Sequence, residues 1–154
     1  MRIGVISDTH DLLRPEAVAF LQGCGHIVHA GDICGPAVLE ALRRIAPLTV
    51  VRGNNDRGDW ADAIPVRASI RIEEVGLYVV HDIADLDIDP RAEGVGVVIT
   101  GHSHRPAVLE RDGVVHLNPG SAGPRRFKLP ISIGEVVVEN GRAVARTTVL
   151  VGPP

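Results

Sequence analysis

Seven side chains able to bind metal ions follow short apolar runs typical of buried β-strands, and this arrangement limits the folds open to the chain. The seven are Asp8, His10, Asp32, Asn54, His81, His102 and His104. The runs before them are rich in β-branched residues, which favour strands. In open α/β sheets, ligands bind where the carboxyl ends of the strands meet. The pattern therefore predicts five strand ends that converge on one site for two bridged metal ions.

Two of the strand ends each supply a pair of these side chains. Asp8 and His10 are two residues apart, as are His102 and His104. In an extended segment, residues two apart point to the same side, so we expect each pair to present two ligands in one direction. The seven side chains offer carboxylate, amide and imidazole groups but no thiolate. Such a set suits Mn²⁺, Fe²⁺, Co²⁺, Ni²⁺ or Zn²⁺, with Mn²⁺ as the first choice, and differs from a cysteine-rich structural zinc site.

Length and composition predict one globular domain spanning residues 1–154. The 154 residues are 45% hydrophobic and carry a formal net charge of −3, which is enough apolar material for a core. Without a basic block, a general nucleic-acid-coating surface is not expected. No apolar stretch approaches the ~20 residues of a membrane helix, so we expect an unprocessed cytoplasmic protein without membrane attachment. Cys24 and Cys34 lack a Cys-x-x-Cys spacing and are expected to be reduced thiols.

Strands alternate with helices in the first half of the chain, which predicts a parallel α/β arrangement. Pro15 suits the first turn of a helix that would end at Gly23. Pro36 suits the start of a second helix, which would end at Pro47. Apolar residues recur at helical spacing in both segments.

Hairpins predominate in the second half, which predicts mostly antiparallel sheet. We expect hairpin turns at Val75-Gly76, at Arg111-Asp112-Gly113 and at Asn140-Gly141, and a short helix over Pro90 to Glu93. Two mixed β-sheets packed face to face and flanked by helices would accommodate both halves of the chain.

Five motifs together resemble those of the calcineurin-like metallophosphoesterases, and within that group the small single-domain prokaryotic phosphodiesterases. The match runs from Met1 to about Ser121 and consists of Asp8-Thr9-His10, Gly31-Asp32, Gly53-Asn54, the lone His81 and Gly101-His102-Ser103-His104. The resemblance implies a four-layer αββα sandwich, which agrees with the elements expected above. It also implies that one metal is held by Asp8, His10 and His104, that the other is held by Asn54, His81 and His102, and that Asp32 bridges them.

The resemblance further implies phosphodiester hydrolysis with two divalent metal ions as cofactors. A hydroxide bridging the ions would attack phosphorus in line while the ions polarise the phosphoryl group. Catalysis would depend on Asp32, Asn54 and His102, and the substrate phosphate would contact Asn55, Ser103 and Arg105. The expected partner is a small phosphodiester substrate, and the frequency of dimers in the family favours a homodimer.

Three features depart from the family pattern. Larger relatives carry a histidine directly after the motif asparagine, credited with protonating the leaving group, where this chain has Asn55. The aspartate that supports this histidine, a few residues after Asp32, is missing as well. An amide cannot act as a general acid near pH 7, so a phosphodiesterase is favoured over a phosphatase. Asp82 and Ile83 replace the Gly-His that follows His81 in many relatives.

Two other functions remain open. The same site could serve a phosphomonoesterase. A scaffold subunit of the eukaryotic retromer resembles this fold with an eroded metal site, so the protein could be a non-catalytic metal-binding scaffold. All seven ligand positions are filled here, which favours the enzyme.

Single residues also have alternative interpretations. Asp8 and Asp32 could cap helices instead of binding metal. Trp60 could stack on a substrate or pack in the core. His29 is expected to be a packed or surface residue rather than a ligand, able to hydrogen-bond a neighbour of the site. Three arginines could contact the far end of a substrate or be solvated surface charges, namely Arg57, Arg125 and Arg126.

Overall fold

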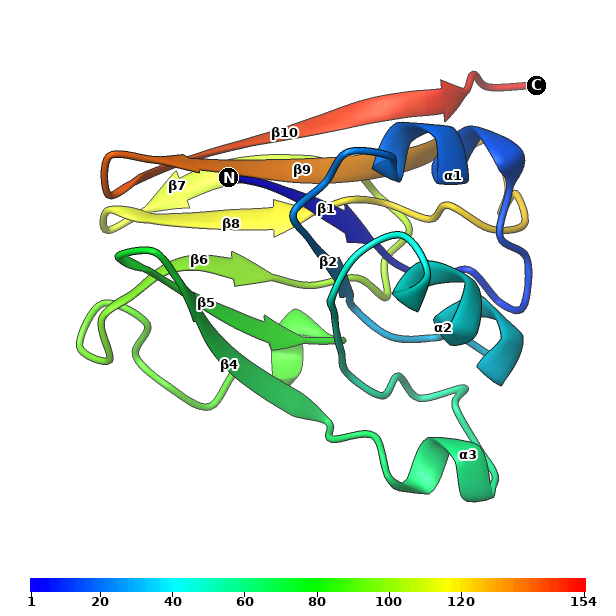
Figure 1. Cartoon of the computed structure of the whole chain (residues 1–154), viewed down its shortest axis with the longest axis horizontal. Coiled ribbons are helices and arrows are strands. Elements are labelled where there is room, and N and C mark those ends of the chain that lie inside the picture. Colours follow the sequence, from blue (N-terminus) through cyan, green and yellow to red (C-terminus); the bar gives the residue numbers. More distant parts are fainter.

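Two five-stranded β-sheets stack face to face in the computed structural model, which describes residues 1–154 (Figure 1). The strand order is β10-β9-β1-β2-β3 in the first sheet and β4-β5-β6-β8-β7 in the second. Each sheet contains both parallel and antiparallel neighbours. The predicted fold class of two mixed sheets flanked by helices is confirmed.

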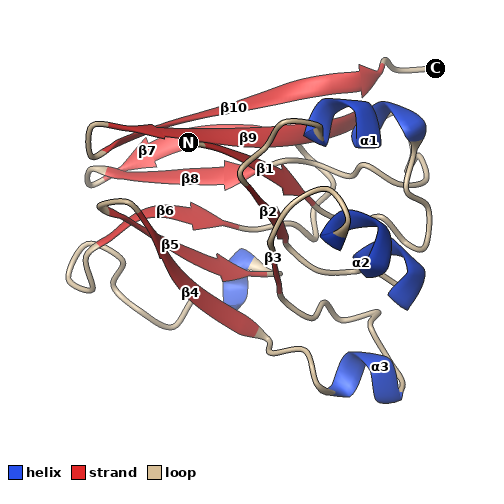
Figure 2. Ribbon diagram, in the orientation of Figure 1, coloured by secondary structure: helices blue, strands red, loops and turns tan.

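Three parallel strands and an antiparallel pair form the first sheet. The strands are β1 (Arg2–Ile6), β2 (His26–His29), β3 (Leu48–Val50), β9 (Ile131–Glu139) and β10 (Arg142–Val151). Helices α1 (Pro15–Leu21) and α2 (Pro36–Arg43) cover the outer face of this sheet (Figure 2). Both begin at the predicted proline, whose fixed φ and missing N–H suit a first helical turn. Leu21 and Leu42 of these helices are fully buried in one cluster with Ile27 of β2.

The second sheet has little helix on its outer face. Its strands are β4 (Arg67–Ile72), β5 (Val75–Val80), β6 (Val95–Ile99), β7 (Ala107–Arg111) and β8 (Val114–Asn118). The 3₁₀ turn η1 (Ile83–Asp85) leads into a loop, and Leu86 and Ile88 of that loop pack on Tyr78 and Val98. The outer layer on this side is therefore mostly loop. None of the helices has the length and apolar character needed to span a membrane.

Aliphatic side chains from both sheets form the core between them. Val5 and Val28 of the first sheet belong to one buried cluster with Leu77, Val97 and Ile99 of the second. Full burial of such a side chain contributes about 1.5–3 kcal/mol relative to exposure. This packing fixes the ends of β1, β2, β5 and β6 relative to one another. The expected metal ligands follow these strands, so their positions depend on this packing.

The second half of the chain is mostly antiparallel, as predicted, through the pairs β4-β5, β7-β8 and β9-β10, while β5, β6 and β8 run parallel. The structure corrects two other predictions. The first hairpin turns at Glu73-Glu74, because Glu73 adopts a left-handed φ of 53°, and Val75-Gly76 lies within β5. Pro90 to Glu93 forms only a turn, while the sequence pattern does not predict the one-turn helix α3 (Asp59–Asp62).

Truncation of Leu42 tests how much the packing of α2 contributes to stability. Leu42→Ala leaves a cavity in the cluster beneath the helix, and we expect the free energy of unfolding to fall by about 2–5 kcal/mol. Urea unfolding of the metal-free protein measures this change. Glu40→Ala, at an exposed position of the same helix, is the control and should change stability by less than about 0.5 kcal/mol. Equal effects of the two substitutions would contradict the packing described.

Candidate metal centre

All seven expected metal ligands lie in the loops that follow strands, at one edge of the molecule where the two sheets meet. Asp8 follows β1, and Asp32 follows β2. His81 follows β5, and His102 follows β6 of the other sheet. The predicted convergence of strand ends is therefore what the structure contains, with both sheets contributing.

The backbone at these positions is left-handed rather than extended. Five of the seven have positive φ, namely Asp8 (54°), His10 (44°), Asp32 (55°), His102 (70°) and His104 (61°). The prediction that both pairs are extended is wrong, because both members of each pair leave the strand conformation. Asp8 and His10 nevertheless direct ligand atoms to within 4.8 Å of each other. Non-glycine residues adopt this region only at an energetic cost, and such residues gather at functional sites.

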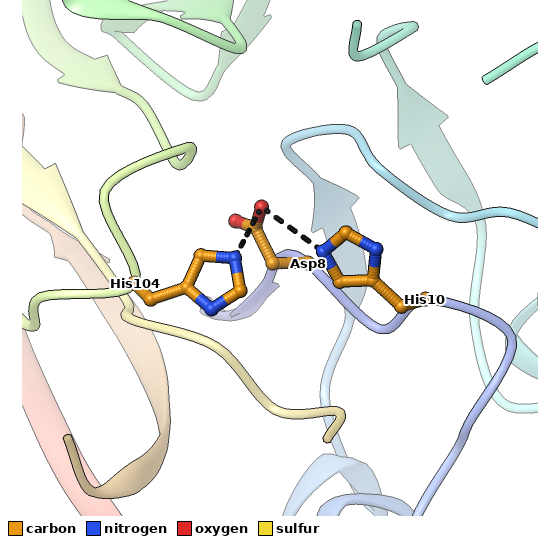
Figure 3. Close-up of side chains that lie close together, drawn as sticks. All are labelled: Asp8, His10 and His104. Atoms are coloured by element: carbon orange, nitrogen blue, oxygen red, sulfur yellow. Dashed lines mark ion pairs between the residues drawn. The ribbon is translucent and has the colours of Figure 1, made fainter. Parts of the chain in front are cut away.

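Asp8 lies at the centre of one group of ligands. Its Oδ1 is 3.3 Å from Nε2 of His104 and 3.8 Å from Nε2 of His10 (Figure 3). Its Oδ2 accepts hydrogen bonds from the Ser7 hydroxyl at 2.6 Å and from the backbone N–H of His102 at 3.1 Å. These two donors fix the carboxylate so that Oδ1 faces the histidines.

Asp32 faces a second group. Its Oδ2 is 3.4 Å from Nε2 of His81 and 3.8 Å from Nε2 of His10. Its Oδ1 accepts the backbone N–H of Asn55 at 2.9 Å, and the Asn55 side-chain amide donates to Oδ2 at 2.8 Å. Asp32 thus lies between His10 and His81, which belong to different expected ligand sets.

The histidines form two pairs. The rings of His10 and His104 have centroids 5.4 Å apart, and those of His81 and His102 are 5.2 Å apart. Nδ1 of His102 lies 3.2 Å from the side-chain oxygen of Asn54. Each pair of rings therefore corresponds to one of the two expected ligand sets.

Several buried atoms that could bind a metal ion have no hydrogen-bond partner, which indicates that the centre suits cations. Three buried atoms that face the centre have no hydrogen-bond partner, namely Asp8 Oδ1, His10 Nε2 and His81 Nε2. Buried polar atoms are rarely left without a partner, since each costs about 1–3 kcal/mol. Ligand atoms of Asp8, His10 and His104 lie within 4.8 Å of one another, as do those of Asp8, Asp32 and His81. Carboxylate and imidazole atoms at this spacing fit divalent metal ions.

Protonation in the centre depends on the buried carboxylates. Burial opposes ionisation of Asp8 and Asp32, but hydrogen bonds and neighbouring charges outweigh it, and both pKa values lie below the ordinary value. Burial also opposes protonation of His81, yet the two carboxylates raise the pKa of His81 to about 9. Burial lowers the pKa of His10. A cation bound at His81 would therefore replace a proton, which couples metal binding to pH.

His29 supports the loops without facing the centre. It is fully buried, and its Nδ1 accepts the backbone N–H of Gly31 at 3.1 Å. That contact leaves the proton on Nε2, which donates to the Thr9 hydroxyl at 3.0 Å, and this hydroxyl donates to the Ile33 carbonyl at 3.2 Å. Burial lowers the pKa of His29 to about 3, so the ring is neutral. Of the packed and surface positions expected for His29, the structure shows the packed one.

Asp56 is a buried residue of the site that the sequence interpretation missed. Its carboxylate accepts three backbone N–H groups, from Asp32 at 3.0 Å, Gly53 at 2.8 Å and Cys34 at 2.8 Å. It therefore ties the loop after β2 to the loop after β3. Its position two residues after Gly53-Asn54 is the one indication of this role in the sequence.

Asp82, the departure beside His81, also lies at the centre. Its Oδ2 is 3.5 Å from Nε2 of His102, and its Oδ1 accepts the backbone N–H of Ala84 at the start of η1. Asp82 and Asn54 therefore lie near different nitrogens of the His102 ring. Cys34 lies nearby, with its Sγ 3.5 Å from Nδ1 of His10. Burial and nearby carboxylates raise the pKa of Cys34 to about 11, which keeps it a neutral thiol.

The three residues expected to contact the substrate phosphate, Asn55, Ser103 and Arg105, have different surroundings in the structure. Asn55 holds Asp32, as described above. The hydroxyl of Ser103 accepts hydrogen bonds from the Arg105 backbone and the Asn118 side chain, and the Arg105 side chain is exposed. Ser103 and Arg105 line neither of the clefts beside the centre.

Two alternative interpretations are resolved. Asp8 and Asp32 cap no helix, because α1 and α2 are preceded by Arg14 and Gly35 at their N-caps. Trp60 packs against the cluster beneath α2 and does not face the centre.

Two clefts adjoin the centre. One, of about 380 Å³, is lined by Asn54, His81 and His102 together with Arg52 and Arg67. The other, of about 340 Å³, is lined by His10, His104 and residues 124–127. Each cleft contains histidines of one expected ligand set, so the centre is accessible from two sides.

Close approach of backbone to the ligands requires glycine at two positions. A Cβ atom on Gly53 would overlap Oδ1 and the backbone nitrogen of Asp32. One on Gly101 would overlap the Ser7 hydroxyl and approach Asp8 Oδ2 to 2.7 Å. The glycines of these motifs therefore make room for the two central carboxylates.

Comparison with known proteins identifies similar sequences and folds. A family model described as the calcineurin-like phosphoesterase superfamily domain matches residues 1–141. A probable metallophosphoesterase of Methanothermobacter thermautotrophicus is 37% identical over 147 residues, which cover 84% of this chain and 82% of the relative.

Two solved structures show the likeness of the fold. One, described as a novel archaeal phosphodiesterase, superposes with a TM-score of 0.79 at 24% identity, covering 96% of this chain and 100% of the other. The other, Vps29 of Entamoeba histolytica in complex with Zn²⁺, has a TM-score of 0.74 at 23% identity and covers 97% of this chain and 99% of the other.

Substitution of Gly53 tests the close approach at Asp32. Gly53→Ala should displace this carboxylate and weaken Mn²⁺ binding by about 10- to 100-fold, as loss of supporting contacts at metal sites does. Isothermal titration calorimetry on protein checked for folding by circular dichroism measures the affinity. Gly152→Ala, where a Cβ meets nothing within 4 Å, is the control. Unchanged affinity in Gly53→Ala would mean that the loop yields without moving Asp32.

The neutral His29 predicts a pH dependence of stability. Because its folded pKa of about 3 lies below the unfolded value of about 6.5, protons favour the unfolded chain as the pH falls through this interval. Between pH 7 and pH 5 this residue alone should lower the free energy of unfolding by about 2 kcal/mol. His29→Gln removes the titrating group, so its stability should decrease less over the same interval. Urea unfolding with chelator in both proteins measures the difference, and parallel losses would show that His29 is not the group responsible.

Proposed function

Because the chain belongs to the calcineurin-like phosphoesterase superfamily, we propose that it is a metal-dependent phosphodiesterase acting on a small phosphodiester. The observation that carries the proposal is the group of buried, unpartnered donor atoms around Asp8 and Asp32, which lies between two clefts. The unpartnered atoms support cation binding. The two clefts support a substrate with a substituent on each side of the phosphate.

The proposal assigns two divalent ions to the seven ligands. Asp8, His10 and His104 would hold one ion, Asn54, His81 and His102 the other, and Asp32 both. When bound, such ions supply a water-derived nucleophile at neutral pH and polarise the phosphoryl oxygens. Mn²⁺ is the proposed ion, and Ni²⁺, Co²⁺, Fe²⁺ or Zn²⁺ suit the same donor set.

Residues around the ligands hold them in place for this role. Ser7 orients Asp8, while Asn55 and the loop tied by Asp56 orient Asp32. The Ala30 carbonyl, 2.7 Å from Nδ1 of His81, directs the other ring nitrogen towards the two carboxylates. A preorganised set of this kind needs little rearrangement on binding, which favours tight coordination.

Preference for a diester over a monoester follows from two features. A monoester carries a second negative charge on its phosphate, and the Asn55 amide, engaged with Asp32, offers neither a cation nor an acid to it. A diester has two substituents, and the centre has a cleft on either side. We therefore place the phosphate of the substrate at the centre with one substituent in each cleft.

The proposal also covers the setting in which the chain works. We propose one catalytic domain over residues 1–154, located in the cytoplasm, with a homodimer as its assembly. The likeness to Vps29 concerns the fold, so a metal-binding scaffold is the alternative outcome of the test below.

Replacement of Asp32 tests the proposed function. Metal-stripped wild-type protein supplied with Mn²⁺ should cleave bis(p-nitrophenyl) phosphate faster than p-nitrophenyl phosphate. Asp32→Asn should lose about a hundredfold or more of this activity while remaining folded, because the amide is a poorer bridge between two cations. Asp59→Asn, at an exposed position of α3, is the matched control and should keep full activity.

Three results would contradict the proposed phosphodiesterase function. Full activity in Asp32→Asn would exclude the two-metal centre. A preference for the monoester would indicate a phosphomonoesterase. Binding of two ions without cleavage of either ester by any of the five metals would indicate the scaffold.

A further inference from the structure

The cleft beside His10 and His104 is bounded by an exposed loop of basic and aromatic character. Residues Pro124, Arg125, Arg126 and Phe127 line it, and Lys128 follows. Since the two histidines also line this cleft, a molecule bound there would extend from the centre itself. The loop is therefore placed to contact one substituent of a substrate.

Anchors at its base hold this loop in position. The Arg14 side chain donates to the Gly123 carbonyl at 3.1 Å. Arg125 donates to the carbonyl of Leu129 at 3.0 Å and to that of Gly152. With Arg125 engaged in this way, Arg126 and Phe127 are the side chains presented at the tip.

Arg126 is a cation without a partner. Its side chain is exposed and makes no ion pair or hydrogen bond within the chain. In the opposite cleft, by contrast, Arg52 lies 3.8 Å from Asp62 and Arg67 lies 3.3 Å from Asp87. The positive charge available to a ligand therefore lies on the Arg126 side of the centre.

Phe127 is the most exposed large hydrophobic residue of the chain. Its relative exposure is 85%, and the next such residue, Val144, reaches 57%. It also adopts a left-handed φ of 54°, which is unfavourable for a bulky side chain. A ring held out beside a cation offers a stacking surface next to an anion contact, a combination that binds nucleotides.

We propose that this cleft binds a nucleotide-like substituent of the substrate, with Phe127 stacked on its planar ring and Arg126 bound to a further phosphate. The guanidinium would form a charge-assisted, bidentate contact with that phosphate. This assignment rests on the proposed function, because it places the scissile phosphodiester at the metal centre. The substrate class is therefore a diester of a nucleotide that carries a second phosphate group.

Three p-nitrophenyl diesters with Mn²⁺ test the assignment. The substrates are thymidine 5′-(p-nitrophenyl phosphate), the same compound with a 3′-phosphate, and methyl p-nitrophenyl phosphate, which lacks the nucleoside. Arg126→Ala should raise KM about 10-fold or more for the 3′-phosphorylated compound only, with kcat unchanged, as expected for loss of one charged contact. Lys128→Ala, which removes the same charge from the same loop outside the cleft lining, should leave all three KM values near those of the wild type.

Phe127 is tested with the same substrates. Phe127→Ala should raise KM for both nucleoside esters and leave methyl p-nitrophenyl phosphate unaffected, while Phe127→Tyr should retain the wild-type values because it keeps a ring. Equal effects of Arg126→Ala and Lys128→Ala, or equal KM changes for all three substrates in Phe127→Ala, would overturn the proposal.

A binding measurement separates this proposal from the proposed function. If the wild type cleaves none of the diesters with any metal, the phosphodiesterase proposal fails. Calorimetric titration with thymidine 3′,5′-bisphosphate and with thymidine 5′-phosphate then still reports on the cleft. Tighter binding of the bisphosphate that disappears in Arg126→Ala would support the subsite, and equal binding of the two nucleotides would exclude it.

Discussion

Two ionised carboxylates, Asp8 and Asp32, are buried at the junction of the two sheets with ligand atoms within 4.8 Å of each other. Burial of one unpaired charge is costly, and two of the same sign repel. The surrounding residues offset this cost through hydrogen bonds from Ser7 and Asn55 and through histidines on both sides. Oδ1 of Asp8 still has no hydrogen-bond partner, and a bound divalent cation would offset the remaining negative charge.

Backbone strain accompanies this electrostatic constraint. The loops after β1, β2 and β6 place ligands in left-handed conformations, and glycines such as Gly53 lie against the carboxylates without room for a side chain. Such conformations persist only when the neighbouring structure holds them. Here the core between the sheets fixes the strand ends, and Asp56 ties two of the loops together. Stability and site geometry are therefore connected through the same few contacts.

The two sides of the centre differ in charge. On the side of His81 and His102, the cleft contains arginines paired with carboxylates. On the side of His10 and His104, the cleft ends in the unpaired Arg126 and the exposed Phe127. A substrate with one charged, ring-bearing substituent and one neutral substituent would match this asymmetry. Arg126 and Phe127 lie in a loop and Arg67 begins β4, whereas the ligands follow the ends of core strands.

The order of residues along the chain was sufficient to predict the strands, the two proline-initiated helices, the mixed sheets and the convergence of the seven polar side chains. These features depend on local periodicity and on strand ends, which a sequence displays directly. Whether the seven bind two metal ions stays a prediction. Tertiary structure alone decided that the ligand loops are left-handed, that Asp56 joins them, that Asn55 holds Asp32 and that Asp82 faces His102. These contacts connect residues up to about 24 positions apart or lie in irregular loops, where no periodic pattern specifies the backbone and the packing of the two sheets determines which groups meet.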